Sequence, residues 1–177
     1  PEVRPDGRVT VNMGPARKAP EVLPFVPEGL ESGTEGASRI YHAHLSCSDV
    51  WFSAVSMGNP HCVIFVRDPD YVDLEQIGPL LENNAIFPQR ANVEFVQVVS
   101  RDHLRMRVWE RGAGETLACG TGACASIVAA VMTGRADRHV VMDLLGGSLT
   151  LDWSPDDGHV YQEGPAQFVF DGEWLGE

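Results

Sequence analysis

The sequence predicts an α+β domain in which a curved, mostly antiparallel sheet wraps around a central buried α-helix. Two observations carry this prediction: many short strand-like runs separated by turn residues, and one strongly apolar, alanine-rich run from Ala123 to Met132. A helix that is apolar on every side has to be buried on most of them. A sheet curved around such a helix is the simplest architecture that buries it.

Strand-like runs occur along the whole chain. They cover residues 8–13, 39–45, 50–57, 62–66, 93–99, 104–109, 140–144, 148–153, 159–161 and 166–170. The run at 104–109 alternates most clearly between apolar and polar residues. Gly146 and Gly147 separate two of the runs and predict a hairpin there. Residues 14–36 hold four prolines and several glycines, which favours a loop or an irregular crossover.

A second helix, amphipathic and shorter, is predicted over residues 73–83 with Asp73 as its N-cap. Its inward face is expected to consist of four apolar residues: Leu74, Ile77, Leu80 and Leu81. Pro79 predicts a kink or a break inside this helix, because proline lacks the N–H group that an internal helical position donates.

Length and charge limit the class of protein. The 177 residues fit one domain or slightly more, and 44% hydrophobic residues are enough for a sizeable core. The net charge of −12 disfavours binding to nucleic acid or to an anionic membrane surface. The longest apolar runs are well short of the ~20 residues that cross a bilayer. The chain begins with Pro1 and no signal peptide is visible, so we expect a fragment, a processed product or a trimmed chain.

Cysteine, histidine and lysine usage limits the compartment and the cofactors. The four cysteines form no C-x-x-C pair and suggest no disulfide framework, which favours a reducing, cytoplasmic setting. The six histidines follow none of the usual zinc spacings, so no metal is expected. Lys18 is the only lysine and lies between prolines in an expected loop. A pyridoxal-phosphate enzyme, which needs a lysine for its Schiff base, is therefore disfavoured.

The most informative stretch joins the strand-like run at 104–109 to the apolar helix. It reads Glu110-Arg-Gly-Ala-Gly-Glu-Thr-Leu-Ala-Cys-Gly-Thr-Gly-Ala-Cys-Ala-Ser126. Cys119, Gly120 and Thr121 are predicted to lie at the helix N-terminus. There, free backbone N–H groups and the helix dipole favour an anion such as a thiolate or a substrate carboxylate. A helix N-terminus also lowers the pKa of a cysteine, so an activated Cys119 thiol is expected.

Polar residues at three places in the sequence suggest a small polar pocket around this turn. Taken singly, Cys119 is most simply a small buried residue in a tight turn, and Asn59, His61 and Asn92 are ordinary turn or core residues. The polar groups beside Cys119 favour a site, because a turn that only has to be tight would not require them. They are Glu110, Arg111, Glu115, Thr116 and Thr121. Asparagines could hold ammonium and carboxylate groups, and arginine could pair with a carboxylate.

Several motifs make the chain resemble the diaminopimelate epimerase family. The longest is the stretch around Cys119 given above, which is highly specific for that family. Two shorter motifs precede it, Gly58-Asn-Pro-His and Ala91-Asn-Val-Glu-Phe. Two more follow it, Glu163-Gly-Pro-Ala and Val169-Phe-Asp-Gly. The resemblance extends over most of the chain.

The resemblance implies an enzyme that interconverts LL- and meso-diaminopimelate in bacterial lysine and cell-wall biosynthesis, without a cofactor or a metal. In that family one cysteine thiolate removes the Cα proton and a second cysteine thiol, on the opposite face, returns one. Carried over by motif, the catalytic residues are Cys119, His61 and Glu110. The substrate contacts are Asn59, Asn92, Glu110, Arg111, Gly120 and Thr121. Backbone N–H groups of the last two would face the substrate's α-carboxylate.

The chain departs from the family pattern in one important respect. The family has two similar lobes with the substrate between them, and the second cysteine lies in a Cys-Gly-Asn-like motif of the N-terminal lobe, which this sequence lacks. Residues 1–177 are therefore interpreted as the C-terminal lobe, with 1–36 as a partly irregular approach segment. Holding half of an acid/base pair, the chain is predicted to be inactive alone and to need the missing lobe as its partner. A homodimer is a further expectation, weakened by Phe170, where the family pattern has tyrosine in the dimer contact.

Other interpretations stay open at this point. Gly120-x-Gly-x-x-Ala125 matches a dinucleotide-binding fingerprint, although no strand ends directly before Gly120 and no βαβ unit follows. Cys119 and His61 could serve a cysteine hydrolase. A proline racemase-like enzyme also places a cysteine in a Cys-Gly-Thr-Gly turn, but lacks the long acidic and glycine-rich lead-in. The chain could also be a folded, non-catalytic fragment.

Overall fold

The computed structural model describes residues 1–17 and 24–176, and Lys18 lies outside the described residues. The strands are β1 (Glu2–Val3), β2 (Arg8–Pro15), β3 (Glu31–Glu35), β4 (Ser38–His44), β5 (Asp49–Ser56), β6 (Pro60–Phe65), β7 (Asn92–Ser100), β8 (His103–Glu110), β9 (Gly114–Glu115), β10 (His139–Leu144), β11 (Gly147–Trp153) and β12 (His159–Pro165). The helices are the 3₁₀ helix η2 (Pro69–Tyr71) and the α-helices α1 (Leu74–Glu82) and α2 (Gly120–Met132). Within the described residues, no helix has the length and apolar character needed to span a membrane.

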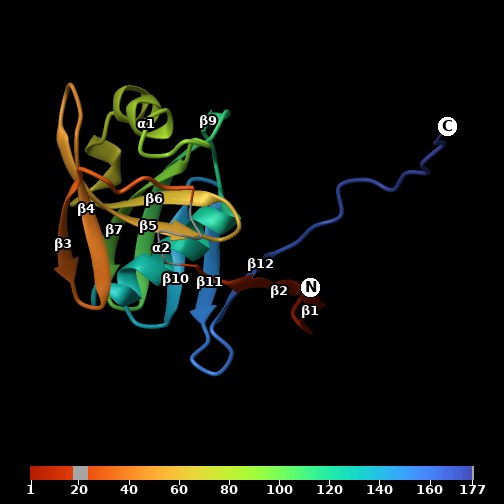
Figure 1. Cartoon of the computed structure of the whole chain (residues 1–177). Helices are drawn as coiled ribbons and strands as arrows, with labels where there is room; N and C mark the ends of the chain where they lie inside the picture. The colour runs from red at the N-terminus through yellow and green to blue at the C-terminus, as the bar shows by residue number, and fades with distance from the viewer. Residues whose placement is uncertain (18–23, 177) are drawn as a thin grey trace.

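The strands form one sheet that folds around α2. Their order along the sheet is β1-β2-β12-β11-β10-β8-β7-β6-β5-β4-β3, and β9 pairs with β8 beside this path. Neighbouring strands are antiparallel except for the parallel pairs β8/β10 and β6/β7. α2 contacts β5, β6 and β7 on one side and β11 and β12 on the other (Figure 1). The predicted curved, mostly antiparallel sheet around a central helix is therefore confirmed.

α2 is buried along most of its length. Every residue from Gly122 to Ala130 is buried. Cys119 is its N-cap, and the helix ends at Thr133 before Gly134, whose φ of +78° is typical of a glycine that stops a helix. Apolar side chains from both halves of the sheet surround it, among them Val63, Met106, Val140, Leu151 and Val160. Because this helix has no polar face, its burial requires a sheet on several sides.

A second core lies on the other face of strands β4 to β7. Its centre is a group of aromatic rings whose neighbouring centroids lie 4.7 to 5.9 Å apart: Phe25, Tyr41, Phe52 and Phe87. α1 covers this core with the buried residues Leu74 and Leu81, and its predicted N-cap Asp73 accepts a hydrogen bond from Gln76 N. The middle strands are therefore held between two cores, which leaves them little freedom to move.

The details of α1 differ from the sequence prediction. Leu80 is 37% exposed, so this one of the four residues expected to face inward does not line the core, whereas the half-buried Ile77 packs against it. Gly78 takes the inward position instead and packs against the Trp109 ring. The break expected at Pro79 does not occur, because the helix continues through it to Glu82. A glycine here lets the helix approach the bulky indole closely, which periodicity alone does not reveal.

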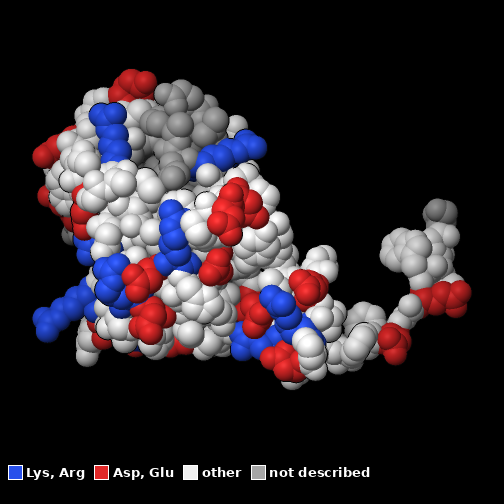
Figure 2. Space-filling model, turned by 90° about the horizontal axis from the view of Figure 1, so that it is seen from below, with Lys and Arg blue, Asp and Glu red and all other residues white. Residues whose placement is uncertain are grey.

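Two further predictions of secondary structure, one of a loop and one of a strand, are wrong. The segment 14–36, expected to be irregular, contains β3, which pairs along its whole length with β4. Residues 166–170, expected to form a strand, form no secondary structure and belong to a tail that extends away from the body (Figure 1). In this tail Phe168 is 99% exposed and Trp174 is 92% exposed. Figure 2 shows the tail projecting freely, with acidic but no basic patches.

Replacing Gly78 with alanine tests the packing of α1 on the sheet. A Cβ atom at this position would lie 2.5 Å from Trp109 Cγ, and the ring is held because Trp109 Nε1 donates a hydrogen bond of 2.8 Å to Glu82 Oε2. We expect Gly78→Ala to lower the free energy of unfolding by about 2 kcal/mol in urea denaturation, as overpacking of a core does. The control is Gly33→Ala, where a Cβ would meet nothing closer than 3.6 Å. Equal stability of the two variants would contradict this account.

Candidate active site

The residues predicted to form a site come together at one end of the sheet. β6 and β7 are parallel and in register, with His61 opposite Asn92, so both strands begin at this end. β8 is antiparallel to β7 and therefore ends here, at Glu110. The chain returns through β9 to the N-terminus of α2, where Cys119 lies. Two parallel strand starts, one strand end and one helix start thus converge, although they are far apart in the sequence.

A buried pair, His61 and Glu94, lies at the centre of this end. His61 Nδ1 is 2.6 Å from Glu94 Oε1, and both side chains are completely buried. His61 Nε2 lies 3.0 Å from Asn59 Oδ1. An imidazolium would donate a hydrogen bond to each of these two oxygens. The pair therefore fixes the ring of His61 and aligns Asn59 next to it.

Glu94 belongs to the site, although its side chain was not identified as functional from the sequence. A carboxylate in the mostly apolar run at 93–99 is a usable signal, because a buried carboxylate requires a partner. Burial raises the pKa of Glu94, and His61 opposes that shift. Among the described residues, Glu94 Oε2 has no hydrogen-bond partner. One carboxylate oxygen is thus available to a further donor or proton.

Cys119 lies beside this pair as the N-cap of α2 and is 7% exposed. Its Sγ is 3.7 Å from Thr121 Oγ1, and Asn59 Nδ2 donates a hydrogen bond of 3.3 Å to the same hydroxyl oxygen. Asn59, His61, Glu94, Thr121 and Cys119 therefore form one connected group. The structure brings together what the sequence placed in three separate segments.

The protonation of Cys119 differs from the expectation for a helix N-terminus. Burial and the nearby charge of Glu94 raise the pKa of Cys119 to about 11, although the Gly122 backbone N–H and the Thr121 hydroxyl act in the opposite direction. The prediction of a lowered pKa is therefore wrong for this structure. Desolvation of the thiolate outweighs the helix terminus, and the resting group is a thiol at neutral pH.

Two glycines make room for this arrangement. A Cβ atom on Gly122 would lie 2.7 Å from Glu94 Oε1 and 3.2 Å from Cys119 Sγ, so only glycine lets both groups approach the helix start. A Cβ atom on Gly120 would lie 2.9 Å from Gln162 Oε1. The glycine-rich sequence at the start of α2 is thus explained by close approach.

The remaining predicted site residues surround the turn between β8 and β9. Asn92 is buried; its Oδ1 accepts a hydrogen bond of 2.9 Å from Arg111 N, and its Nδ2 donates one of 3.4 Å to Pro60 O. The exposed Arg111 side chain donates to Gln89 O. Glu110 accepts a hydrogen bond from Thr116, and its charge contributes to the raised pKa of both Glu94 and Cys119. Asn92 is thus a structural link in this geometry, and the Arg111 guanidinium is directed toward the loop at Gln89.

A second buried carboxylate, Glu82, anchors the same turn from α1. Its two oxygens accept hydrogen bonds from Gly112 N at 2.8 Å, Trp109 Nε1 at 2.8 Å and Arg90 Nη1 at 3.1 Å. Arg90 adopts a positive φ of 59°, which is unusual for a residue other than glycine. The position of the turn that carries Glu110 and Arg111 therefore depends on the packing of α1.

The other cysteines are placed differently from Cys119. Cys124 and Cys62 are completely buried, and burial raises the pKa of Cys124 to about 12 and that of Cys62 well above its ordinary value. Cys124 follows Cys119 by five residues, about 140° around the helix axis. Cys47 is exposed in the turn between β4 and β5. None of these three thiols is placed to oppose Cys119 across one substrate carbon.

Residues 53–169 match the family model described as diaminopimelate epimerase. The chain belongs to the diaminopimelate epimerase family. A diaminopimelate epimerase of Synechococcus elongatus is 51% identical over 174 residues, which are 97% of this chain and 60% of that protein. The chloroplastic diaminopimelate epimerase of Oryza sativa subsp. japonica is 50% identical, over 97% of this chain and 49% of that protein. The chain thus spans only about half to three-fifths of the length of these diaminopimelate epimerases.

Solved structures share the fold at low sequence identity. A hydroxyproline epimerase from Agrobacterium vitis superposes with a TM-score of 0.56 and 16% identity, covering 90% of this chain and 50% of that one. A probable proline racemase from Agrobacterium radiobacter gives a TM-score of 0.52 and 14% identity, covering 93% of this chain and 54% of that one. These likenesses concern the fold alone.

The influence of Glu94 on Cys119 can be tested by alkylation with iodoacetamide, followed peptide by peptide in mass spectrometry. Because the thiolate is the reactive form, the Cys119 rate should rise roughly tenfold per pH unit between pH 7 and 10, below the pKa of about 11. Glu94→Gln removes the charge that helps to raise this pKa, so it should speed alkylation several-fold at pH 8.5. The matched control is Glu115→Gln, which removes an exposed carboxylate paired with Arg107. An unchanged rate in Glu94→Gln would contradict the assignment.

Proposed function

We propose that this chain supplies one half of the active site of a diaminopimelate epimerase, which interconverts LL- and meso-2,6-diaminopimelate in lysine and peptidoglycan biosynthesis. The observation that carries the proposal is the position of Cys119. It begins a buried helix beside the His61–Glu94 pair and is embedded in the motif most specific for the family. The proposal extends to this chain an activity that its relatives carry by name.

Inversion of a carbon centre needs a base on one face and an acid on the other. Cys119 would supply one of the two. With a pKa of about 11 its resting form is the thiol, so Cys119 is suited to give its proton to the carbanion while a second group removes the original Cα proton. In the opposite direction the Cys119 thiolate takes the Cα proton. The Gly122 N–H and the Thr121 hydroxyl favour that thiolate once it has formed.

The surrounding residues would position the substrate and Cys119. Backbone N–H groups of Gly120 and Thr121, at the start of α2, are suited to the α-carboxylate, where the helix dipole also favours negative charge. Asn59 and Asn92 offer amide groups to the substrate, and Glu110 and Arg111 offer charges of both signs. Glu94 joins this set as a positioning residue, because it acts on Cys119 through charge and on Asn59 through His61. No step of this mechanism requires a cofactor or a metal.

The proposal includes a second lobe. Residues 1–177 would form the C-terminal lobe, and an N-terminal lobe would supply the opposing cysteine and the other wall of the substrate site. Three observations support this division: Cys119 has no opposing thiol, the relatives are longer than this chain, and the tail exposes Phe168 and Trp174. The complete protein is proposed to act in the cytoplasm, where its four free thiols stay reduced. A homodimer is part of the same proposal, with Phe170 as a departure from the tyrosine of the family's dimer contact.

The activity is tested by NMR, following exchange of the diaminopimelate Cα proton in D₂O together with the ratio of stereoisomers. The chain alone should invert no substrate, because it holds one acid/base group. Joined to the N-terminal segment of the Synechococcus elongatus relative, it should epimerise diaminopimelate, and Cys119→Ala should reduce that rate by at least about 100-fold. L-proline serves as the substrate control for a proline racemase-like activity.

Each outcome of this experiment has a defined meaning. Inversion by the chain alone would refute the half-site. A folded two-lobe protein, checked by circular dichroism, that inverts proline and not diaminopimelate would refute the substrate. A two-lobe Cys119→Ala variant that keeps its full rate would refute the role of Cys119.

Substrate binding by the helix start is a separate prediction. If the Gly120 and Thr121 amides receive the α-carboxylate, their ¹⁵N–¹H resonances should shift when meso-diaminopimelate is added to the two-lobe protein. The same resonances should stay in place with cadaverine, which keeps both amines and lacks both carboxylates. Equal shifts with the two compounds would contradict carboxylate binding at this helix terminus.

A further inference from the structure

A group of metal-ligating side chains lies on β3 and β4, apart from the proposed active site. Tyr41 and Ala43 of β4 face the aromatic core, so the alternating residues His42 and His44 face outward. The register of the sheet places Glu31 of β3 directly opposite His42. Two imidazoles and a carboxylate thus share one outer surface of the sheet, close to the edge strand β3.

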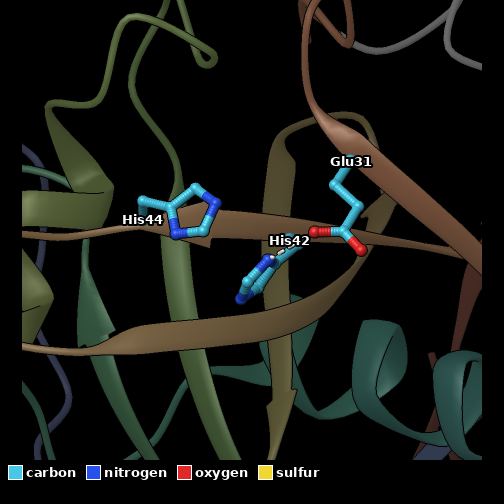
Figure 3. A group of neighbouring side chains, drawn as sticks. All are labelled: Glu31, His42 and His44. Atoms are coloured by element: carbon cyan, nitrogen blue, oxygen red, sulfur yellow. Dashed lines mark hydrogen bonds and ion pairs between the residues drawn. The ribbon is translucent and has the colours of Figure 1, made fainter.

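The three side chains are close enough to share one ion. One ligand atom of each lies within 4.8 Å of the other two. His42 Nδ1 is 3.1 Å from Glu31 Oε2, and Figure 3 shows His42 between Glu31 and His44. Ligand atoms that are ~2.0–2.2 Å from a tetrahedral zinc ion are ~3.4 Å from one another. The Glu31–His42 distance of 3.1 Å already fits. The His44 ligand atom lies within 4.8 Å of the other two, and its 70% exposed side chain is free to move closer.

Neighbouring residues on β5 orient both imidazole rings. His42 stacks on Trp51, with ring centroids 4.6 Å apart and an angle of 10° between the planes. His44 Nδ1 lies 2.9 Å from Asp49 Oδ1, and within the described residues no hydrogen bond engages its Nε2. A carboxylate on one ring nitrogen is the usual outer partner of a histidine whose other nitrogen binds a metal. Asp49 therefore holds His44 in the tautomer that leaves Nε2 available as a ligand.

We propose that Glu31, His42 and His44 bind one divalent transition-metal ion, with zinc the best match, and that Asp49 and Trp51 orient the two imidazoles. Two nitrogen donors exclude the oxygen-preferring ions calcium and magnesium, whereas imidazole with a carboxylate suits zinc, nickel and copper. Three protein ligands leave the fourth position to water. The bound ion would join the edge strand β3 to β4.

The competing interpretation is that two histidine–carboxylate pairs at the surface, His42–Glu31 and His44–Asp49, simply lie side by side. Such pairs contribute little to stability and require no third partner. The two interpretations differ in one measurable property. A metal site needs His42 and His44 together, whereas two pairs that merely adjoin, with the ring centroids 4.4 Å apart, would bind no ion.

Isothermal titration of the metal-free chain with zinc chloride tests the proposal. We expect one zinc ion per chain at this site, and an affinity more than about tenfold lower in both His42→Ala and His44→Ala, since loss of even an outer partner commonly costs that much. The matched control is His139→Ala, which removes an exposed histidine that pairs with Asp152 alone. Cys47→Ser, in the adjacent turn, separates imidazole binding from binding by the exposed thiol.

A spectroscopic measurement makes the result independent of the calorimetry. Nickel bound to His42 lies next to the stacked indole of Trp51, so it should quench the tryptophan fluorescence that comes from Trp51. In Trp51→Phe this quenching should be absent. The proposal is overturned if zinc does not bind. It is equally overturned if His42→Ala and His44→Ala bind zinc as tightly as the unchanged chain, or if Cys47→Ser alone abolishes binding.

Discussion

Burial of α2 is the constraint on which the rest of this structure depends. The helix has no polar face: Ile127 and Val128 on one turn are as buried as Ala123 and Ala130 above and below them. Such a helix is stable in water only if a sheet encloses it. The order of the strands, the curvature of the sheet and the two parallel pairings all serve that enclosure. The first helical residues, Gly120 and Thr121, are only half-buried, and the proposed site lies at this end of the helix.

The chemistry of Cys119 follows from the same constraint. A thiol at the start of an exposed helix would be activated by the helix terminus. Here the helix is buried, the thiol is largely removed from water, and Glu94 adds a negative charge nearby. Both effects favour the neutral form of Cys119. The same burial would exclude water from the proposed carbanion chemistry, and it keeps Cys119 protonated. The proposal therefore gives Cys119 the role of proton donor first.

The sequence predicted the features that local patterns determine. The buried helix, the N-cap Asp73 and the hairpin at Gly146–Gly147 each depend on residues within a few positions of one another, and each is confirmed. Two strand assignments were not predicted. β3 was missed although it is local, because the prolines and glycines of segment 14–36 favoured a loop; it pairs with the next strand, β4, across Gly36 and Ala37. Residues 166–170 stay unpaired because no described strand receives them.

The candidate site also contains features that could be predicted from the sequence and features that could not. Its motif residues could be found from the sequence, because glycine spacing and polar side chains beside a helix start are local signals. The partnership of His61 with Glu94 could not, since 33 positions separate them and only the parallel pairing of β6 with β7 joins them. The direction of the pKa shift of Cys119 could not be predicted from the sequence either, because it depends on burial and on that same distant carboxylate.

Both free edges of the sheet are poorly suited to pairing with another strand. A free edge presents unpaired N–H and C=O groups to any other strand, including one from another molecule. At one end β1 has only two residues, which is too short to template a partner. At the other end β3 is five residues long, carries Glu31 and Glu35 at its two ends and has Gly33 at its centre. Two copies meeting along β3 would bring like charges together, so electrostatic repulsion protects the molecule from edge-to-edge association.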